Sequence, residues 1–215
     1  MSEARTTERI LGQLRNRILL GELLPGEQLR QERLAEDLNI SRVTLREALL
    51  ILANEGLLTH HPNKGFIVTK RTPEELTQVH LLLSILENEL IAPGLAWPDR
   101  STLMRLRDLN KRMGALVDAK DWIEVITLNH EFHRTLWRLS PLNLVVAEVE
   151  RVWGLADAYI AESYRLPAHR AAAVAEHEKI IEALSGRDLD QLRQAHFAHR
   201  ESTRHGAAES ILGLA

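Results

Sequence analysis

Residues 29–68, LRQERLAEDLNISRVTLREALLILANEGLLTHHPNKGFIV, decide the fold of the N-terminal part of this chain. The pattern predicts a helix, a tight turn, a second helix and then a two-stranded hairpin. Leu34 and Leu38 lie four residues apart and mark the apolar face of a short first helix. Asn39 suits the turn, and Ser41 is a good N-cap for the second helix.

The second helix has one apolar face and one polar face. Its buried face is predicted to consist of Leu45, Ala48, Leu49 and Leu52. Arg42, Thr44 and Arg46 remain on the outer side near the helix N-terminus. A helix can enter the DNA major groove with these positions at the base edges, where Arg binds guanine and Thr binds base or phosphate. We therefore expect this helix to read DNA.

The hairpin follows Gly56, with β-type runs at 57–59 and 66–68 around the turn Pro62-Asn63-Lys64-Gly65. Its basic tip can reach a neighbouring phosphate or the minor groove. The alternative is a plain helical hairpin with a solvated basic face. The added hairpin, with Lys64 at its tip, favours the DNA-binding interpretation.

These features resemble the winged helix-turn-helix of the GntR family of bacterial transcription regulators, over residues 8–70. The resemblance is carried by Leu34-Ala35, Ile40-Ser41-Arg42, the run from Leu45 to Leu49, Leu52, Glu55-Gly56-Leu57 and Gly65. It implies DNA contacts from Arg33, Ser41, Arg42, Thr44, Arg46, Asn63, Lys64 and Gly65. Arg33 is only a weak substitute among these DNA contacts, because Glu32 occupies the position where some relatives place a DNA-contacting arginine.

Charge is distributed unevenly between the two parts of the chain. Residues 1–72 hold 11 Lys and Arg against 9 Asp and Glu, whereas the remainder holds 16 against 21. The N-terminal part thus has a net charge of +2 and the rest −5, which agrees with DNA contact by the former alone. There is no cysteine, hence no disulfide or thiolate metal site. With no signal-peptide pattern and no apolar run of membrane-spanning length, we expect a soluble cytoplasmic protein.

The predicted organisation is a mainly α protein of two domains. Residues 1–70 form the winged helix-turn-helix, which opens with a helix over 7–19; residues 71–73 form a linker, and 74–215 form an all-α six-helix bundle. The bundle helices are predicted at 73–96, 101–118, 121–139, 142–165, 168–184 and 188–208, with Ser101 as the second N-cap.

Polar residues fall on the predicted apolar stripes of three bundle helices. They are Asn129 and His133 on the third, His177 on the fifth, and His196 and His199 on the sixth. Taken singly, each histidine is more simply a core residue bonded to a backbone carbonyl. A buried polar group lowers the stability of the fold by about 1–3 kcal/mol unless it is paired. Several such groups in one bundle therefore predict a shared partner. Three imidazoles and one amide oxygen could hold a divalent transition metal with positions left open.

The same segments are similar to the FCD ligand-binding domain of the FadR branch of GntR regulators. The similarity is carried by Asn129-His130-Glu131-Phe132-His133, by Glu176-His177 with Ile180 and Ala183, and by the run from Ala195 to His199. It implies a metal, zinc or nickel, held by Asn129, His133, His177 and His199. His196 is the competing choice for the last ligand. Six bundle helices would place the chain in the VanR-like subgroup.

Two departures from the FCD pattern bear on the effector. Asn129 replaces the commoner Asp and removes a negative charge, and Leu83 stands where relatives place an arginine. An organic acid remains one candidate class of effector, with His80 and Arg134 as the candidate contacts.

The predicted function is a homodimeric regulator whose affinity for a pseudo-palindromic operator in double-stranded DNA changes when a small molecule binds near the metal. A metalloenzyme with an appended DNA-binding domain is one alternative. However, His130-Glu131-Phe132-His133 is H-E-x-H and lacks the H-E-x-x-H spacing of a zinc protease. A bundle that only dimerises, with ordinary histidines and no effector, is the other alternative.

Overall fold

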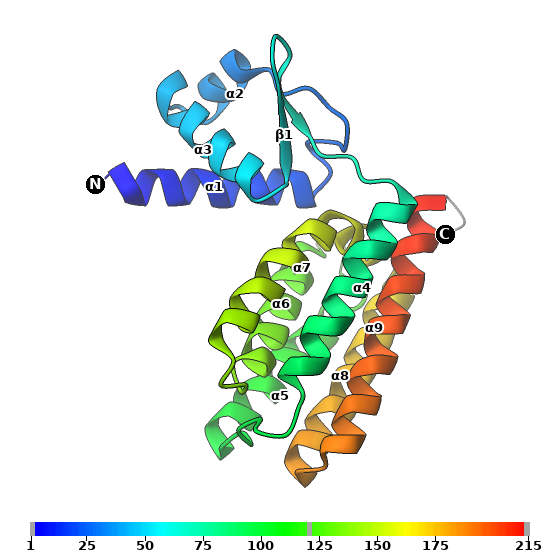
Figure 1. The fold of residues 1–215 in the computed structure, drawn as a ribbon. Helices are drawn as coiled ribbons and strands as arrows, with labels where there is room; N and C mark the ends of the chain where they lie inside the picture. Colours follow the sequence, from blue (N-terminus) through cyan, green and yellow to red (C-terminus); the bar gives the residue numbers. More distant parts are fainter. Residues whose placement is uncertain (1–2, 120–121, 213–215) are drawn as a thin grey trace. The chain divides into compact units, whose positions relative to one another are not determined.

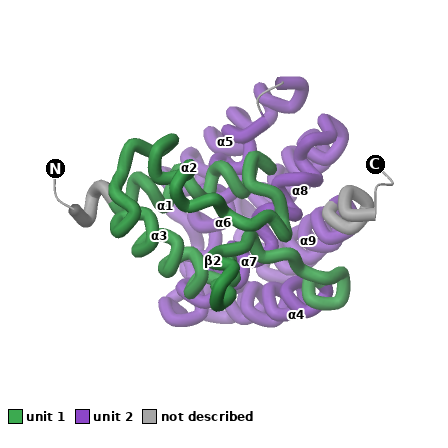
Figure 2. Tube along the Cα trace, turned by 90° about the horizontal axis from the view of Figure 1, so that it is seen from above, with its two compact units in different colours: residues 1–76 green, residues 77–215 purple. Residues whose placement is uncertain are grey.

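The computed structural model describes residues 3–119 and 122–212. The chain divides into two compact units, Met1–Leu76 and Thr77–Ala215, which are coloured separately in Figure 2. Each unit has its own hydrophobic core and is described by itself.

The first unit is a helix-turn-helix followed by a two-stranded wing, as predicted (Figure 1). Its elements are α1 (Glu3–Leu19), α2 (Gln31–Asp37), α3 (Arg42–Asn54), β1 (Leu58–His61) and β2 (Gly65–Val68). The two strands pair antiparallel, from Leu58 opposite Val68 to His61 opposite Gly65. Gln28 forms a further bridge to Ile67, so the segment before α2 lies along the wing.

Apolar spacing explains why these elements pack together. Ile10 and Leu14 of α1, Leu45 and Leu49 of α3, and Phe66 of β2 all have side chains without solvent exposure. One small core thus fixes α3 against α1 and the wing. An ion pair between Arg15 and Glu55, 2.6 Å, adds a polar link between α1 and the end of α3.

The turn between α2 and α3 has the predicted chemistry. Asn39 adopts a left-handed conformation with φ 52°, which Asn tolerates better than most residues. The Ser41 hydroxyl accepts a hydrogen bond from the Thr44 amide at 3.1 Å, so Ser41 caps α3. The cap fixes where α3 begins and therefore which side chains its first turn exposes.

The second unit is a bundle of six helices within the described residues, as predicted (Figure 1). The helices are α4 (Pro73–Leu90), α5 (Arg100–Ala115), α6 (Ile123–Trp137), α7 (Asn143–Ser163), α8 (Pro167–Gly186) and α9 (Leu189–Leu212). α8 packs against both α5 and α9, α6 packs against α5, and α7 packs against α9. None of the described helices is long and apolar enough to cross a membrane.

Several predicted helix ends were wrong: α1 begins at Glu3 rather than 7, α5 ends at Ala115 rather than 118, and α9 ends at Leu212 rather than 208. Two further errors have a clear local cause. α4 ends at Leu90 rather than 96, because Pro93 and Gly94, the latter with φ 110°, cannot continue it. The N-cap of α5 is Asp99 rather than Ser101: its carboxylate accepts the Thr102 amide at 2.7 Å. The serine hydroxyl donates to that same carboxylate instead.

A buried arginine, Arg170 at the start of α8, joins three helices. It is 2% exposed, and its guanidinium donates to the carbonyls of Tyr164 (2.5 Å) and Arg165 (3.1 Å), just after α7. It also donates to the carbonyls of Val117 (2.7 Å) and Ala119 (3.4 Å), beyond α5. Helix C-termini leave carbonyls without intrahelical partners, and Arg170 satisfies them in the bundle interior.

Candidate functional site

The first turn of α3, the helix predicted to read DNA, is largely exposed to solvent. Arg42, Val43 and Arg46 are exposed, whereas Thr44 is half-buried and its hydroxyl lies 2.8 Å from the Ser41 hydroxyl. The guanidinium of Arg42 forms an ion pair of 2.9 Å with Glu32 of α2, and both side chains are 72% exposed. Glu32 is therefore a local partner of Arg42, and Arg33 beside it is exposed.

Two glutamines that the sequence did not single out lie beside the tip of the wing, and one of them is hydrogen-bonded to it. Gln28 donates to the Lys64 carbonyl at 2.5 Å. A Cβ on Gly65, where φ is 76°, would lie 3.0 Å from the amide of Gln31. Asn63 is also left-handed, with φ 68°. Asn63 and Lys64 are exposed at this tip, so the predicted basic tip is available to a DNA backbone.

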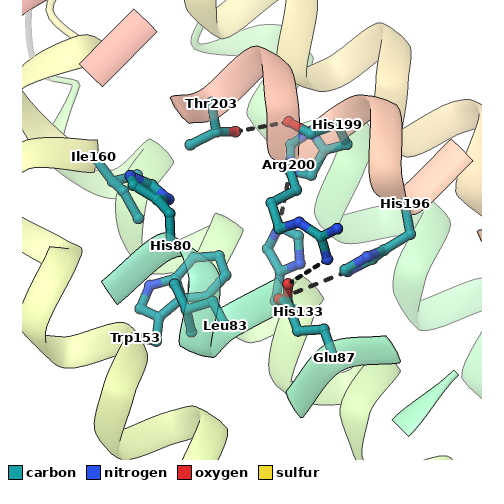
Figure 3. A pocket seen from close by; sticks show the side chains of 10 residues that line it. All are labelled: His80, Leu83, Glu87, His133, Trp153, Ile160, His196, His199, Arg200 and Thr203. Atoms are coloured by element: carbon teal, nitrogen blue, oxygen red, sulfur yellow. Dashed lines mark hydrogen bonds and ion pairs between the residues drawn. The ribbon is translucent and has the colours of Figure 1, made fainter. Parts of the chain in front are cut away.

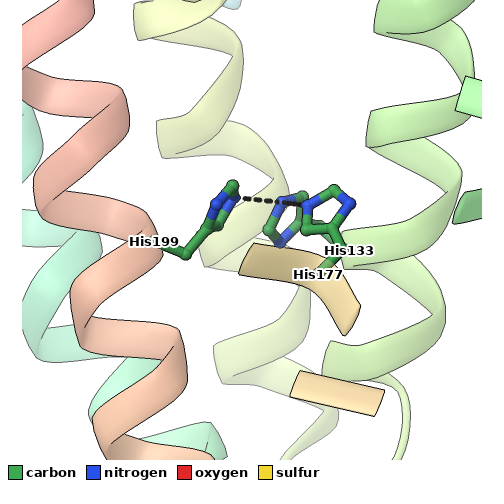
Figure 4. A group of neighbouring side chains, drawn as sticks. All are labelled: His133, His177 and His199. Atoms are coloured by element: carbon green, nitrogen blue, oxygen red, sulfur yellow. Dashed lines mark hydrogen bonds between the residues drawn. The ribbon is translucent and has the colours of Figure 1, made fainter. Parts of the chain in front are cut away.

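The second site lies inside the bundle, where three histidines from three helices converge (Figure 4). His133 of α6 has its Nε2 atom 3.1 Å from Nε2 of His199 on α9. The Nε2 atom of His177 on α8 lies 3.3 Å from that of His133. All three side chains are buried, with at most 3% exposure. The three ring nitrogens thus face one small volume.

This cluster fits a transition metal. Nitrogen ligands at the usual 2.0–2.1 Å from zinc would be about 2.8–3.4 Å apart for octahedral to tetrahedral angles. The two measured nitrogen–nitrogen distances fall in that range. Three facing imidazole nitrogens cannot all be satisfied by sharing protons, because each neutral ring has only one N–H. Imidazole donors suit zinc, nickel, iron or copper.

Burial keeps His133 and His177 in the form that a metal would require. Burial, reinforced by the neighbouring His199 and His177, holds the pKa of His133 well below its usual range. Burial, followed by His199 and His196, has the same effect on the pKa of His177. Both rings are therefore neutral at pH 7, and their lone pairs are free to bind a cation.

Neighbouring side chains orient the rings. The Nδ1 atom of His199 lies 2.8 Å from a carboxylate oxygen of Glu176, which places the proton on Nδ1 and leaves Nε2 as the free donor. Phe132 stacks on His177 with ring centroids 3.9 Å apart and planes 10° apart. Trp153 packs against His133 at 4.7 Å. The Nδ1 atoms of His133 and His177 have no hydrogen-bond partner among the described residues.

Asn129 lies one turn before His133 on α6 and is 1% exposed. Its side-chain oxygen accepts a hydrogen bond from the Tyr164 hydroxyl at 3.2 Å. An amide oxygen has two lone pairs, so it can accept this bond and still offer one lone pair to a metal.

His196 lies outside the cluster. Its Nε2 atom faces a carboxylate oxygen of Glu87 at 3.7 Å, and its ring centroid is 6.2 Å from that of His133. Burial lowers the pKa of His196 to about 3. Burial also raises the pKa of Glu87 to about 7, although the Arg200 guanidinium draws it down. The geometry therefore favours His199 over His196 as the fourth candidate ligand.

A cavity adjoins the histidine cluster, and Figure 3 shows the side chains around it. His133 and His199 belong to its wall, together with His80 and Leu83 of α4. The space open to a water-sized molecule is about 20 Å³. Arg134 is not part of this wall; its guanidinium pairs with Glu150 on α7 at 3.1 Å. Of the two predicted effector contacts, the structure brings one to the cavity.

Glu131, the acid of H-E-x-H, points elsewhere: it forms an ion pair with Arg105 of α5 and is partly exposed. No acid from this motif reaches the cluster to act as a general base, as a zinc protease would need.

Several residues of the site were missed from the sequence. Arg200 and Glu87 line the cavity, and each lies four residues after a member of the same wall, His196 and Leu83 respectively. Helical phase could therefore have flagged both as charged residues that face inward. Glu176 gives no such signal, because its partner His199 belongs to another helix.

Comparison with known proteins places both halves of the chain. Residues 6–68 match the family described as bacterial regulatory proteins, gntR family, and residues 71–202 match the FCD domain. A helix-turn-helix transcriptional regulator from an unstable DNA locus of Streptomyces ambofaciens is 31% identical over 92% of this chain and 84% of its own length. The regulator McbR of Escherichia coli K12 is 25% identical over 90% of this chain and 88% of its own.

Solved structures agree on the fold. The structure of E. coli McbR has a TM-score of 0.83 at 21% identity and covers all of both chains. A GntR transcriptional regulator of Rhodococcus sp. RHA1 has a TM-score of 0.77 at 25% identity, covering 94% of this chain and 97% of its own. The relatives are named as regulators and not as enzymes. The chain therefore belongs to the GntR family of bacterial transcription regulators, in the branch that joins the DNA-binding helix-turn-helix to an FCD effector-binding domain.

Proposed function

We propose that this regulator is a homodimer that binds a divalent transition metal, zinc or nickel, in its FCD domain and a small metabolite beside that metal. The observation that carries the proposal is the convergence of three buried Nε2 atoms next to a cavity. Occupancy of that cavity changes the affinity of the helix-turn-helix for its operator, because the effector binds two conformations of the dimer unequally.

Asn129, His133, His177 and His199 hold the metal in this proposal. When bound, the metal supplies positive charge and open coordination positions for a donor group of the effector. His133 and His199 also line the cavity, so an effector bound in it would lie next to the metal. His80, which also lines the cavity, contributes a contact from α4.

On the DNA side, Arg42 and Arg46 read base edges in the major groove, and Ser41 and Thr44 contact the backbone. The wing tip, Asn63-Lys64-Gly65, contacts an adjacent phosphate or the minor groove. A two-fold dimer places two recognition helices about 34 Å or a multiple apart, which requires a pseudo-palindromic operator. Because this operator is bacterial DNA, we place the regulator in the cytoplasm.

The dimer is supported by an apolar surface on α4. Leu81, Leu82 and Ile85 are 60%, 47% and 52% exposed, on one side of a helix whose other side forms the cavity wall. Exposed apolar side chains grouped in this way mark protein contacts. We expect Leu81→Glu with Ile85→Glu to give monomers in sedimentation analysis. Met104→Glu on α5, also at an exposed apolar residue, is the matched control.

The metal site is tested by metal analysis of the purified protein, with thermal melts before and after chelation. We expect about one metal per chain and a melting temperature that falls by several degrees on chelation. His177→Ala should lose the metal, whereas His205→Ala, at an exposed histidine of α9, should retain it. If the purified protein contains no metal and its melting temperature does not change when zinc or nickel is added, the proposed metal site is refuted. The proposed DNA binding would not be affected by that result.

A further inference from the structure

A buried ion pair lines the candidate effector cavity. Glu87 of α4 and Arg200 of α9 are 2% and 8% exposed, and the guanidinium Nη1 of Arg200 lies 3.4 Å from a carboxylate oxygen of Glu87. Its other carboxylate oxygen lies 3.7 Å from Nε2 of His196. Figure 3 shows these three side chains meeting at one edge of the cavity.

Both distances are long for charge-assisted hydrogen bonds, which are commonly about 2.7–2.9 Å. The carboxylate is therefore held loosely by both partners. Its removal would nevertheless leave the Arg200 guanidinium buried and uncompensated, which is strongly unfavourable. Whatever displaces Glu87 from this position must consequently bring a negative charge of its own.

The size of the cavity requires such a displacement. The space open to a water-sized molecule, about 20 Å³, holds little more than one water. A metabolite that is to lie fully inside this space needs a wall side chain to move. Leu83, Trp153 and Ile160 are large apolar parts of the wall, whereas the Glu87 carboxylate sits at the end of a flexible side chain. Its departure opens space at the place where a new anion would meet Arg200.

We propose that Glu87 is a built-in stand-in for the anionic group of the effector: its carboxyl group occupies the position beside Arg200 in the effector-free protein and is displaced when a small carboxylate binds. This inference rests on the proposed effector site and adds its mode of regulation. The exchange keeps the buried charge balanced, and it brings the ligand within the wall that contains His133 and His199. The residue expelled belongs to α4.

That helix is suited to report the exchange. α4 begins directly after the linker, where Thr72 and Glu75 form a reciprocal cap: the Thr72 amide donates to Glu75 at 2.8 Å and the Glu75 amide to the Thr72 hydroxyl at 3.2 Å. Arg71 donates to the Gly56 carbonyl at 3.0 Å and attaches the linker to the helix-turn-helix unit. A shift of α4 at Glu87 is thus a shift of the segment that continues into the DNA-binding unit.

The test uses acetate as the probe and acetamide as its neutral counterpart, titrated calorimetrically into the full-length protein, both zinc-loaded and metal-free. The variants are Glu87→Gln, Arg200→Gln and the two combined, with Glu89→Gln, at an exposed residue of the same helix, as control. If Glu87 occupies Arg200 in about nine molecules of ten, Glu87→Gln should tighten acetate binding about tenfold. Arg200→Gln should weaken it, and the combined variant should match Arg200→Gln alone.

Acetamide binding should change little in any of the variants, since it offers no charge to Arg200. Acetate affinity that is unchanged or weaker in Glu87→Gln, in protein whose circular dichroism shows that it is folded, would overturn the proposal. The proposal would also be overturned if the zinc-loaded protein bound acetate with the same affinity in wild type, Glu87→Gln and Arg200→Gln. Failure of the wild-type protein to bind zinc would count against the proposed metal site alone, because exchange at Arg200 is still measured in the metal-free protein.

Discussion

Glu176 should govern metal affinity although it is not a ligand. Its carboxylate lies 2.8 Å from Nδ1 of His199, and the two side chains are 19% and 4% exposed, so water screens their interaction little. It is the partner that fixes the tautomer of His199, one of the proposed ligands, while the Nδ1 atoms of His133 and His177 have no partner among the described residues. The orientation of the whole set therefore depends heavily on this one contact.

Loss of such an outer partner typically weakens metal binding 10–100-fold, or about 1.4–2.7 kcal/mol. Glu176→Gln keeps an oxygen that can accept the Nδ1–H bond and removes only the charge, so we expect about a tenfold loss. Glu176→Ala removes the acceptor as well and should approach 100-fold. Zinc affinity is measured at fixed pH by competition with a chromophoric chelator, and the cobalt(II) spectrum reports whether the coordination geometry is retained.

The neighbouring acid provides the control. Glu178 accepts a hydrogen bond from Asn110 of α5 at 3.2 Å and is exposed, so Glu178→Gln should leave zinc affinity unchanged. In a His199→Ala background, Glu176→Gln should have no further effect, because its partner is gone. Equal zinc affinity for Glu176→Gln, Glu176→Ala and wild type would refute the reasoning.

Three further predictions concern DNA reading, stability and pH. Arg46→Ala should weaken operator binding by about 1–3 kcal/mol, well beyond its effect on random DNA; equal losses in a binding titration would exclude base reading. Arg170→Met leaves four backbone carbonyls without their donor and should lower the free energy of unfolding, measured in urea, by about 2–4 kcal/mol. The control Arg151→Met, at an exposed arginine, should change this free energy by no more than about 0.5 kcal/mol. In metal-free protein, the pKa values of His133, His177 and His196 are lowered, so below pH 6.5 the unfolded chain binds more protons than the folded protein does. The free energy of unfolding should therefore drop by about 1.4 kcal/mol per pH unit for each such proton. Glu87 acts in the opposite direction: its pKa is raised from 4.5 to about 7, so its contribution to stability is present below pH 4.5 and is lost as pH rises through 7. Glu87→Gln should therefore steepen the fall in melting temperature at acid pH. A melting temperature that does not change with pH in either protein would contradict both statements.

Much of the architecture could be predicted because the decisive signals are local. The spacing of apolar residues in α3, the Ser41 cap and the left-handed Asn39 are properties of short segments, and they specify the helix-turn-helix before any long-range contact forms. The same helical periodicity placed His133, His177 and His199 on buried faces. Errors arose where competing local signals were close together: Pro93 with Gly94 stopped α4 before Pro98 could, and Asp99 capped α5 before Ser101 could.

The sequence by itself determined that two domains form, that a basic helix and wing face outward, and that three helices each turn a histidine inward, because periodicity decides which side of an element is buried. Only the tertiary structure decided which side chains from different helices meet. It selected His199 over His196 for the cluster, turned Arg134 toward Glu150, and brought Glu176 to His199 and Arg200 to Glu87. Pairs such as Glu87 and Arg200 are separated by more than a hundred residues, and no local pattern encodes their contact; it follows from how the helices pack against one another.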